Sequence, residues 1–551
     1  MTRVAEVGRG IRGAIAASGA KHRRLRAGAA VFVVAAAVGI LGVASSEGAT
    51  QRATAGSTAT LAIFQEPDTL DPAAATLISS YQVLQSIFDP LMYQIGGKVY
   101  PGLATSMTVS KDSRTYTFML RKGVTFQDGT PFNAQAVKYN FDRIVNPKYK
   151  AGTALGNLGP YQATKVINPY EVQIIFKTPN ASFENEVTTQ PFGISSPTAI
   201  RKYGANYGSH PVGTGPFTFK QWQRGQAVEV VRNPKYNWGP AGASNTGAAK
   251  IAVVTFRILS DNSAQANALQ TGEVTIAQNL NPPDVQSDLS SGKFFRLATP
   301  ATGIPYALLL NTQKAPTDDV KVRQALEYAV DQGTIVKTLF GGLVTPATSV
   351  YMAGMQGYSQ SQHIYSYNPA KAGALLDADG WTQGSGGIRT KNGTKLSVDL
   401  LSITNFGFDG IAQLVQAQFK AVGVQANLSD EGFPGVFQDY NKGVQNIANF
   451  FYYDVDPFSI SSIFGCKFVG NGLNWAHFCD TTFDAQVAAA NGISNTAART
   501  LAYQKLGTTI MNDATIIPIY NPNAQFIGSK SLHGLKFTVN TAPMFNNVTM
   551  Q

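Results

Sequence analysis

The chain has 551 residues and a formal net charge of +11, and only 14% of its residues are charged. This length predicts about two to four domains, each large enough to bury its own core. The low charged fraction, together with plentiful Gly, Thr, Ser, Asn and Gln, excludes a coiled coil or a disordered chain and favours an exported globular protein that is rich in loops.

More than half of the positive charge lies at the N-terminus. Residues 1–45 carry seven Lys and Arg side chains and one acid, Glu6, so a charge of +5 remains for the other 506 residues. A nucleic-acid-binding protein needs a strongly basic surface, so the chain is not expected to bind nucleic acid.

The first 45 residues have the pattern of an export leader. A basic segment, residues 1–26, precedes the uninterrupted apolar run Ala27–Val43, which is shorter than the roughly 20 residues of a membrane-spanning helix. We therefore expect residues 1–45 to be a signal peptide, with an uncleaved N-terminal anchor as the alternative. Residues 46–57, rich in Ser, Thr, Gly and Ala, are expected to be a linker.

The first predicted strand begins at Thr60–Phe64 and leads into a turn. The turn sequence QEPDTLDP, Gln65–Pro72, contains Asp68 and Asp71, whose side chains are typical turn stabilisers. A helix is expected next, over Tyr81–Phe88.

The stretch Pro101–Ile144 predicts a small scaffold of two strands and a helix. Thr115–Leu120 is β-branched and aromatic, which favours a strand, and the Gly residues that follow favour turns. Asn133 is placed to cap a helix over Ala134–Ile144, where apolar residues recur at helical spacing. No nucleophile or metal-binding cluster occurs in this stretch.

This stretch resembles the signature of the family 5 extracellular solute-binding proteins, which are the peptide- and nickel-chelate-binding subunits of ABC importers. The residues that match the family pattern are Leu103, Ala104, Ser106, Ser110, Asp112, Thr115–Phe118, Leu120, Arg121, Gly123, Phe126, Asp128, Gly129, Pro131, Ala134 and Val137. Further family-like segments follow in the family's order: Pro211–Trp222, Pro316–Phe340 and Tyr367–Trp381.

The resemblance implies an α/β fold of the periplasmic-binding-protein-like type II class. It has two lobes joined by a hinge and an inserted subdomain, as in the large cluster C type. The first lobe is expected to be discontinuous. The expected boundaries are 58–92, 211–300 and 515–551 for lobe I, 93–210 for the inserted subdomain, and 301–514 for lobe II.

The sequence contains no recognisable enzyme motif. It lacks G-x-S-x-G, H-E-x-x-H and a Walker A sequence, and its five histidines are far apart. We expect no catalytic residue, no metal site and no cofactor. Cys466 and Cys479 could bridge in an oxidising compartment, or meet a metal together with His477. Their segment also resembles a cysteine-paired loop of the family, which implies a disulfide.

The segment Tyr452–Pro457, with sequence YYDVDP, is the main candidate ligand site. Tyr452 and Tyr453 beside Asp454 and Asp456 suit a ligand that has an apolar body and a cationic end. In peptide-binding relatives the first Asp of the similar segment takes the peptide α-amino group. That position falls on Tyr453 without a gap and on Asp454 with a one-residue shortening. The alternative is that both acids only shape a turn before Pro457.

Five further residues are weaker ligand candidates. Dipeptide-binding relatives carry an Arg before the helix that here begins near Ile411, and the segment Ser402–Phe408 has none. A strict dipeptide binder is therefore disfavoured. The candidates here are Asn405, Phe406 and Phe408, with Tyr306 at the expected crossing between lobes; the aromatic residues could instead belong to the core. Asp68 could face the cleft or only stabilise its turn.

The function implied by the resemblance is a receptor outside the cytoplasmic membrane. It captures a peptide or peptide-like solute between two lobes and delivers it to the membrane permease of an ABC transporter. Alternatives are a binder of a metal chelate, an oligosaccharide or another small molecule, and an exported hydrolase. We expect a monomer that meets the membrane through its permease or through an uncleaved anchor.

Overall fold

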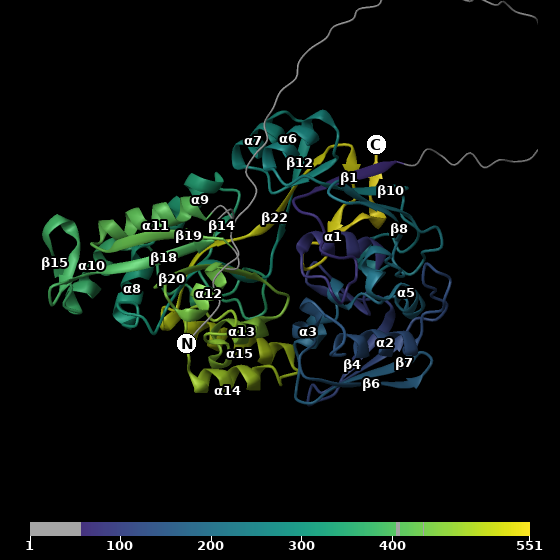
Figure 1. Ribbon diagram of the computed structural model, residues 1–551, viewed down its shortest axis with the longest axis horizontal. Coiled ribbons are helices and arrows are strands. Elements are labelled where there is room, and N and C mark those ends of the chain that lie inside the picture. The colour runs from purple at the N-terminus through teal and green to yellow at the C-terminus, as the bar shows by residue number, and fades with distance from the viewer. Residues whose placement is uncertain (1–56, 404–407, 433–434) are drawn as a thin grey trace, which may run out of the picture. The chain divides into compact units, whose positions relative to one another are not determined.

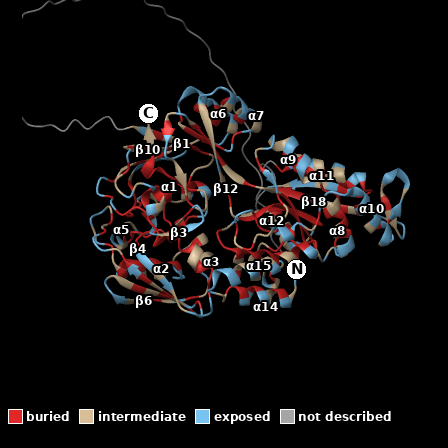
Figure 2. Ribbon diagram, turned by 180° about the vertical axis from the view of Figure 1, so that it is seen from behind, coloured by how far each residue is buried: buried red, intermediate tan, exposed pale blue. Residues whose placement is uncertain are grey.

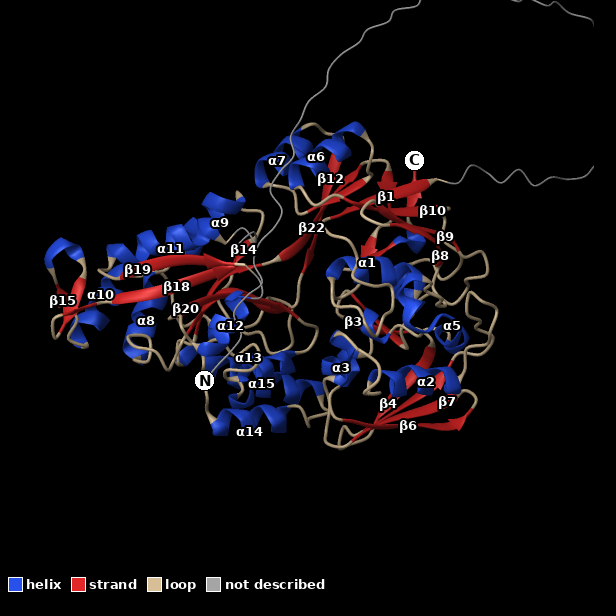
Figure 3. Ribbon diagram, viewed as in Figure 1, coloured by secondary structure: helices blue, strands red, loops and turns tan. Residues whose placement is uncertain are grey.

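The computed structural model describes residues 57–403, 408–432 and 435–551 (Figure 1). Two large mixed sheets carry helices on their faces (Figure 3). The predicted signal peptide and nearly all of the linker lie outside the described residues. None of the helices in the described ranges is long and apolar enough to cross a bilayer.

The first sheet has seven strands, and its strand β1 pairs in parallel with both neighbours, β10 and β11. The order across the sheet is β12 (Phe294–Pro300), β22 (Asn523–Ser529), β11 (Ile276–Gln278), β1 (Thr58–Ile63), β10 (Val253–Ile258), β9 (Ala227–Arg232) and β8 (Phe217–Gln223). Helices α1 (Ile78–Ile87), α6 (Asn262–Thr271) and α7 (Pro282–Ser290) belong to the same region (Figure 1).

Strand β1 is buried on both faces. Its successive side chains point in opposite directions and so pack into two different apolar clusters. Leu61 and Ile63 join the apolar cluster that includes Leu84 of α1. Ala62 joins a second cluster with Leu269 of α6 and belongs to the opposite face. The strand is therefore the centre of the sheet.

A four-stranded antiparallel sheet forms the core of the region between β1 and β8. Its order is β4 (Ala104–Val109), β5 (Thr115–Leu120), β7 (Glu171–Phe176) and β6 (Tyr161–Asn168). Helix α2 spans Ala134–Ile144, as the sequence predicts, and the Asn133 side chain accepts a hydrogen bond from the Ala136 N–H, 3.1 Å away. The remaining elements of this region are the hairpin β2 (Met92–Ile95) and β3 (Lys98–Pro101), and helices α3 (Thr153–Leu158), α4 (Phe183–Glu186) and α5 (Pro197–Tyr203).

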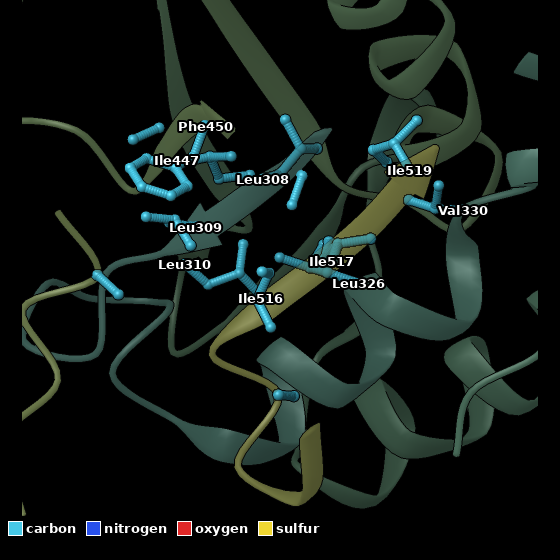
Figure 4. Close-up of a cluster of buried hydrophobic side chains, with 14 of the residues drawn as sticks. Leu308, Leu309, Leu310, Leu326, Val330, Ile447, Phe450, Ile516, Ile517 and Ile519 are labelled. Atoms are coloured by element: carbon cyan, nitrogen blue, oxygen red, sulfur yellow. The ribbon is translucent and has the colours of Figure 1, made fainter. Parts of the chain in front are cut away.

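The second large sheet has six strands. Their order is β14 (Thr345–Pro346), β21 (Ile516–Asn521), β13 (Gly303–Leu310), β20 (Ile447–Tyr453), β18 (Ser397–Ile403) and β19 (Gln425–Glu431). Strands β18 and β19 are parallel and are joined through helix α11 (Asp409–Ala421), which confirms the predicted βαβ unit. Side chains of β13, β20 and β21 pack with Leu326 and Val330 (Figure 4).

Seven helices besides α11 and several short strands complete the chain, and buried residues concentrate in the sheets (Figure 2). The helices are α8 (Val320–Ala329), α9 (Gln332–Phe340), α10 (Pro369–Ala378), α12 (Gly435–Lys442), α13 (Ile460–Phe464), α14 (Thr481–Ala490) and α15 (Thr496–Asn512). The short strands are β15 (Thr382–Gln383), β16 (Arg389–Lys391), β17 (Thr394–Lys395), β23 (Leu532–His533), β24 (Lys536–Phe537), β25 (Pro543–Met544) and β26 (Thr549–Met550).

The chain passes between the two large sheets twice, from β12 to β13 and from β21 to β22. The expected lobe boundary at residue 515 differs from this topology, because β21 pairs with β13 in the second sheet. Its residues Ile516 and Ile517 are buried in the core of that sheet. The change of sheet therefore comes after Asn521.

Candidate functional site

The turn that follows strand β20 fixes the position of Asp454. The Asp454 N–H donates to the Thr302 carbonyl, 3.1 Å away. Its side-chain Oδ1 accepts hydrogen bonds from the N–H groups of Val455, at 2.7 Å, and Asp456, at 3.2 Å. Such Asx-type bonding holds the carboxyl group in one orientation. No backbone N–H group of the described residues donates to the other oxygen, Oδ2.

Gly303, at the start of β13, allows the end of β20, which precedes Asp454, to come close to the segment that crosses between the sheets. Gly303 pairs with Tyr453 and has a φ of +126°. A Cβ atom at this position would lie 2.0 Å from the Tyr452 carbonyl oxygen. Any other residue would force the two strands apart, so this glycine sets where the Asp454 turn begins.

Asp454 lines a cavity of 290 Å³ whose walls come from distant parts of the chain. Aromatic rings and aliphatic side chains form part of the wall, and polar side chains, several of them Thr and Asn, form the rest. The lining of the cavity includes Tyr81, Asn157, Glu186, Thr302, Tyr452 and Asp454.

A second carboxyl group, that of Glu186 on α4, lies within hydrogen-bonding reach of Asp454 in this cavity. Glu186 is only 4% exposed, and its Oε2 accepts a hydrogen bond from Asn157, at 2.7 Å. Burial raises the pKa of Asp454 to about 6, with a further rise from the charge of Asp456. Burial, and then the Asp454 charge, raise the pKa of Glu186 well above its usual range.

Asp456 serves a different purpose from Asp454. It is 1% exposed, and the Arg499 guanidinium contacts both of its oxygens, at 2.6 and 2.9 Å. Asn185 also donates to its Oδ2, at 2.8 Å, and Phe458 N–H donates to Oδ1, at 2.9 Å. Because every oxygen is satisfied and the residue lines neither cavity described here, we retain Asp454 and remove Asp456 from the candidate ligand residues.

A larger cavity, of 1170 Å³, adjoins the small one and shares Thr302, Val455 and Val539 with it. Its wall includes Gly96 and Gly97 at the tip of the β2–β3 hairpin, and residues from α15. Pockets for drug-sized ligands measure roughly 300–1,000 Å³. The two cavities together therefore suit an extended ligand.

The family model for the bacterial extracellular solute-binding proteins, family 5 (Middle), matches residues 98–469, more than half of the chain. The chain belongs to this family. The resemblance seen in the sequence is thereby confirmed, and so is the expectation of an exported solute-binding protein.

Relatives of family 5 match nearly the whole chain. The glutathione-binding protein GsiB of Salmonella typhimurium is 30% identical over 524 residues, which cover 93% of this chain and 98% of the relative. NikA of Brucella suis in complex with Fe(III)-EDTA has a TM-score of 0.79 at 24% identity, covering 90% of this chain and all of that one. The Bacillus subtilis oligopeptide-binding protein AppA with a nonapeptide has a TM-score of 0.72 at 21% identity, covering 90% and 99%. These likenesses confirm the predicted fold class.

The other predicted ligand residues of this family 5 chain fall into three groups. Tyr452 and Tyr453 line the small cavity, beside Asp454. Tyr306 and Phe408 are buried against one another, with ring centroids 4.9 Å apart, which agrees with the core alternative. Asn405 and Phe406 lie outside the described residues.

Asp68 follows its structural alternative. The Asp68 carboxylate accepts hydrogen bonds from Thr69, Thr76 and Ser80 and so holds its own turn. Asp68 is absent from the lining of both cavities, although Thr76 lines the small one. It therefore supports the wall of the small cavity and has no direct place in it.

Sequence reasoning missed Glu186, Asn157 and Tyr81. All three precede Asp454 by more than 260 residues, and they reach the cavity only because the chain folds back. Tyr81 sits where a helix was expected, and its hydroxyl donates to Thr153 Oγ1, at 2.9 Å. The segment around Glu186 carries no motif that distinguishes it from an ordinary amphipathic turn.

Cys466 and Cys479 form a disulfide, as the family resemblance implies. The metal alternative is not supported, because the Nε2 atom of His477 bonds to the Tyr440 carbonyl, at 2.8 Å. Within the described ranges no group of three or more His, Cys, Asp or Glu side chains could hold a metal ion.

Proposed function

We propose that this protein captures a peptide or peptide-like solute with a cationic end outside the cytoplasmic membrane and delivers it to an ABC permease. The observation that carries the proposal is the Asp454 carboxyl group, which two backbone N–H groups orient through Oδ1 and which lines the small cavity. It stands in a half-apolar cavity that opens into a space large enough for several residues.

In this proposal the ligand ammonium binds Asp454 in the small cavity. Hydrogen bonds between charged partners are shorter and stronger than neutral ones, and exclusion of water strengthens them further. The rest of the ligand extends into the larger cavity. Its wall carries Gly96, Gly97 and several Thr residues, and these leave backbone groups accessible to a peptide of variable sequence.

The ligands of the relatives agree with an amine-bearing ligand only in part. Glutathione and an unmodified nonapeptide each carry a primary ammonium group, whereas Fe(III)-EDTA does not. Overall similarity therefore leaves the ligand class open, and the preference for an amine-bearing ligand rests on Asp454.

We also propose a lobe division that follows the sheets. Lobe I would comprise residues 58–92, 211–300 and 522–551, and lobe II residues 301–521, with the inserted subdomain at 93–210. The protein would act as a monomeric binding subunit without catalytic activity. Its contact with the membrane would be made through the permease or an uncleaved N-terminal anchor.

The first test compares the wild type with Asp454→Asn. The protein is incubated with a library of unmodified tri- to pentapeptides and with the same library after N-acetylation, and retained peptides are identified by mass spectrometry. We expect retention of unmodified peptides alone. Calorimetry on a retained peptide should then show binding at least roughly tenfold weaker for Asp454→Asn, because a hydrogen bond to a charged group is lost.

The melting temperature of the ligand-free variant is the control. Asp454→Asn keeps a side-chain oxygen that can accept the Val455 and Asp456 N–H groups, so it should melt no earlier than the wild type. Equal affinity of the two proteins for the retained peptide would contradict the assignment of Asp454. Equal retention of both libraries would contradict an amine-bearing ligand.

A further inference from the structure

Glu186 and Asp454 present two carboxyl groups to one cavity from segments 268 residues apart in sequence. Glu186 ends helix α4 of the predicted subdomain, whereas Asp454 follows β20 of the second sheet. The protein satisfies one oxygen of each group: Asn157 donates to Glu186 Oε2, and two backbone N–H groups donate to Asp454 Oδ1. The two carboxyl groups also share a hydrogen bond with each other, which requires one proton between them.

No basic side chain in the described part of the chain forms an ion pair with Glu186 or Asp454. Within the described residues, every ion pair shorter than 4.0 Å involves another carboxylate. Arg499, the partner of the neighbouring Asp456, is held by that carboxylate in a contact of 2.6 Å. Two carboxyl groups within hydrogen-bonding reach of each other at a buried site repel one another unless a proton or a cation joins them.

The groups around the pair add negative rather than positive character. Asp456 lies next to it and raises the pKa of both carboxyl groups, although Arg499 balances its charge. Tyr452, beside Asp454 on β20, and Tyr81, on α1, face the pair and stay neutral because burial raises their pKa. Asp68 lies farther out and acts on Tyr81.

We propose that Glu186 and Asp454 together hold the cationic group of the ligand, and that this group replaces one proton that the pair shares in the ligand-free closed protein. This inference rests on the proposed function, because it takes the ligand to carry an ammonium. It adds Glu186 as a residue that determines specificity.

The charges balance in this exchange. The ligand-free pair holds one proton between two carboxyl groups and has a net charge of −1. When an ammonium ion binds, the proton leaves to solvent, and two carboxylates with one cation again sum to −1. The cavity thus keeps the same net charge, and the ligand competes directly with a proton. A neutral or N-acetylated ligand cannot make this exchange.

The ligand-free protein gives the first test. The native pair binds a proton more tightly than the unfolded chain does, so stability falls as pH rises from about 4 through the raised pKa values. Glu186→Gln removes the second charge and can keep the contact with Asn157. We expect its melting temperature relative to the wild type to rise steadily between pH 5 and pH 8.

Glu171→Gln is the matched control. Glu171 lies in the same predicted subdomain, bonds to Asn168 at 2.9 Å and lines neither cavity. Its melting temperature should follow the wild-type profile at every pH. A difference between Glu186→Gln and the wild type that does not change with pH would overturn the shared proton.

The second test measures protons released on binding. A retained unmodified peptide is titrated calorimetrically at pH 6.5 in phosphate and in Tris, whose ionisation enthalpies differ. We expect the wild type and Glu171→Gln to release roughly one proton per ligand and Glu186→Gln to release none. Wild-type affinity should increase with pH, whereas that of Glu186→Gln should not.

The outcomes separate this inference from the proposed function. Binding without proton release, or with equal release from Glu186→Gln, would overturn the two-carboxyl site while the peptide receptor stands. Failure of the wild type to retain any peptide would count against the peptide receptor. The ligand-free pH profile would then decide the carboxyl pair on its own.

Discussion

Asp454 and Asp456 lie two residues apart and have different roles because different groups face them. Arg499 and Asn185 satisfy Asp456 on both oxygens, so its charge is fully used inside the protein. Asp454 meets backbone N–H groups on one oxygen and the cavity on the other. A buried charge that is paired within the protein contributes to the structure. A buried charge that has no partner within the protein favours binding of an oppositely charged ligand.

Asp456→Asn should therefore destabilise the protein, in contrast to Asp454→Asn. Removing one member of a buried ion pair costs about 3–5 kcal/mol, since the remaining Arg499 charge is left uncompensated. Urea unfolding of both variants measures the difference. Comparable free energies of unfolding for the two variants would contradict the division of roles.

The sequence allowed the acidic segment Tyr452–Pro457 to be predicted as a candidate ligand site. It did not show which of its two acids, Asp454 or Asp456, is paired within the protein. The aromatic and acidic residues of Tyr452–Pro457 stand out in the sequence. Which acid is free depends on Arg499, 43 residues away, and on Asn185, 271 residues away. Glu186 was missed for the same reason, because only the fold brings it next to Asp454 in the small cavity.

At the scale of elements, predictions from local sequence patterns were correct where residues close together in the sequence determine the helix or strand. Helix α2 begins at the Asn133 cap and ends at the predicted residue, and the β18–α11–β19 unit has the predicted parallel pairing. Strand β21 is different. Its apolar run indicates burial but does not say in which sheet, and the prediction placed it in the wrong one.

The disulfide stabilises a loop between helices α13 and α14. Cys466 and Cys479 are 13 residues apart, and a bridge over a loop of this size contributes about 3 kcal/mol in the chain-entropy model. Replacing both cysteines by serine should lower the free energy of unfolding by roughly that amount. Chemical denaturation measures it. Ligand affinity should not change, because neither cysteine lines a cavity.

At the scale of the molecule, Asn491 is one of the residues that join the segments following strand β20 to the region around Asn180. Asn491, just after α14, accepts from the Ala181 N–H through its carbonyl, at 2.8 Å, and from the Ser182 N–H through Oδ1, at 3.0 Å. Asp456 and Asn185 form another such contact. A hinge motion that separates these segments would have to break these bonds.

Asn491→Ala should shift the protein toward an open form. It removes the side-chain bond to Ser182, worth about 1 kcal/mol, and so weakens ligand binding by roughly five-fold if closure is required. Small-angle scattering of the ligand-free variant should show a larger radius of gyration. Asn427→Ala, an exposed position on β19, is the control. Unchanged scattering and affinity would show that Asn491 does not contribute to closure.

The place of β21 and β22 in the two sheets has a consequence for biosynthesis. β21 lies between β14 and β13 of the second sheet, and β22 lies between β12 and β11 of the first. The second sheet cannot complete its pairing until residue 521 has left the ribosome, and the first sheet until residue 529 has, when nearly the whole chain exists. A nascent chain thus stays unfinished during translation, a property that suits passage through a translocation channel as an unfolded polypeptide and folding on the far side.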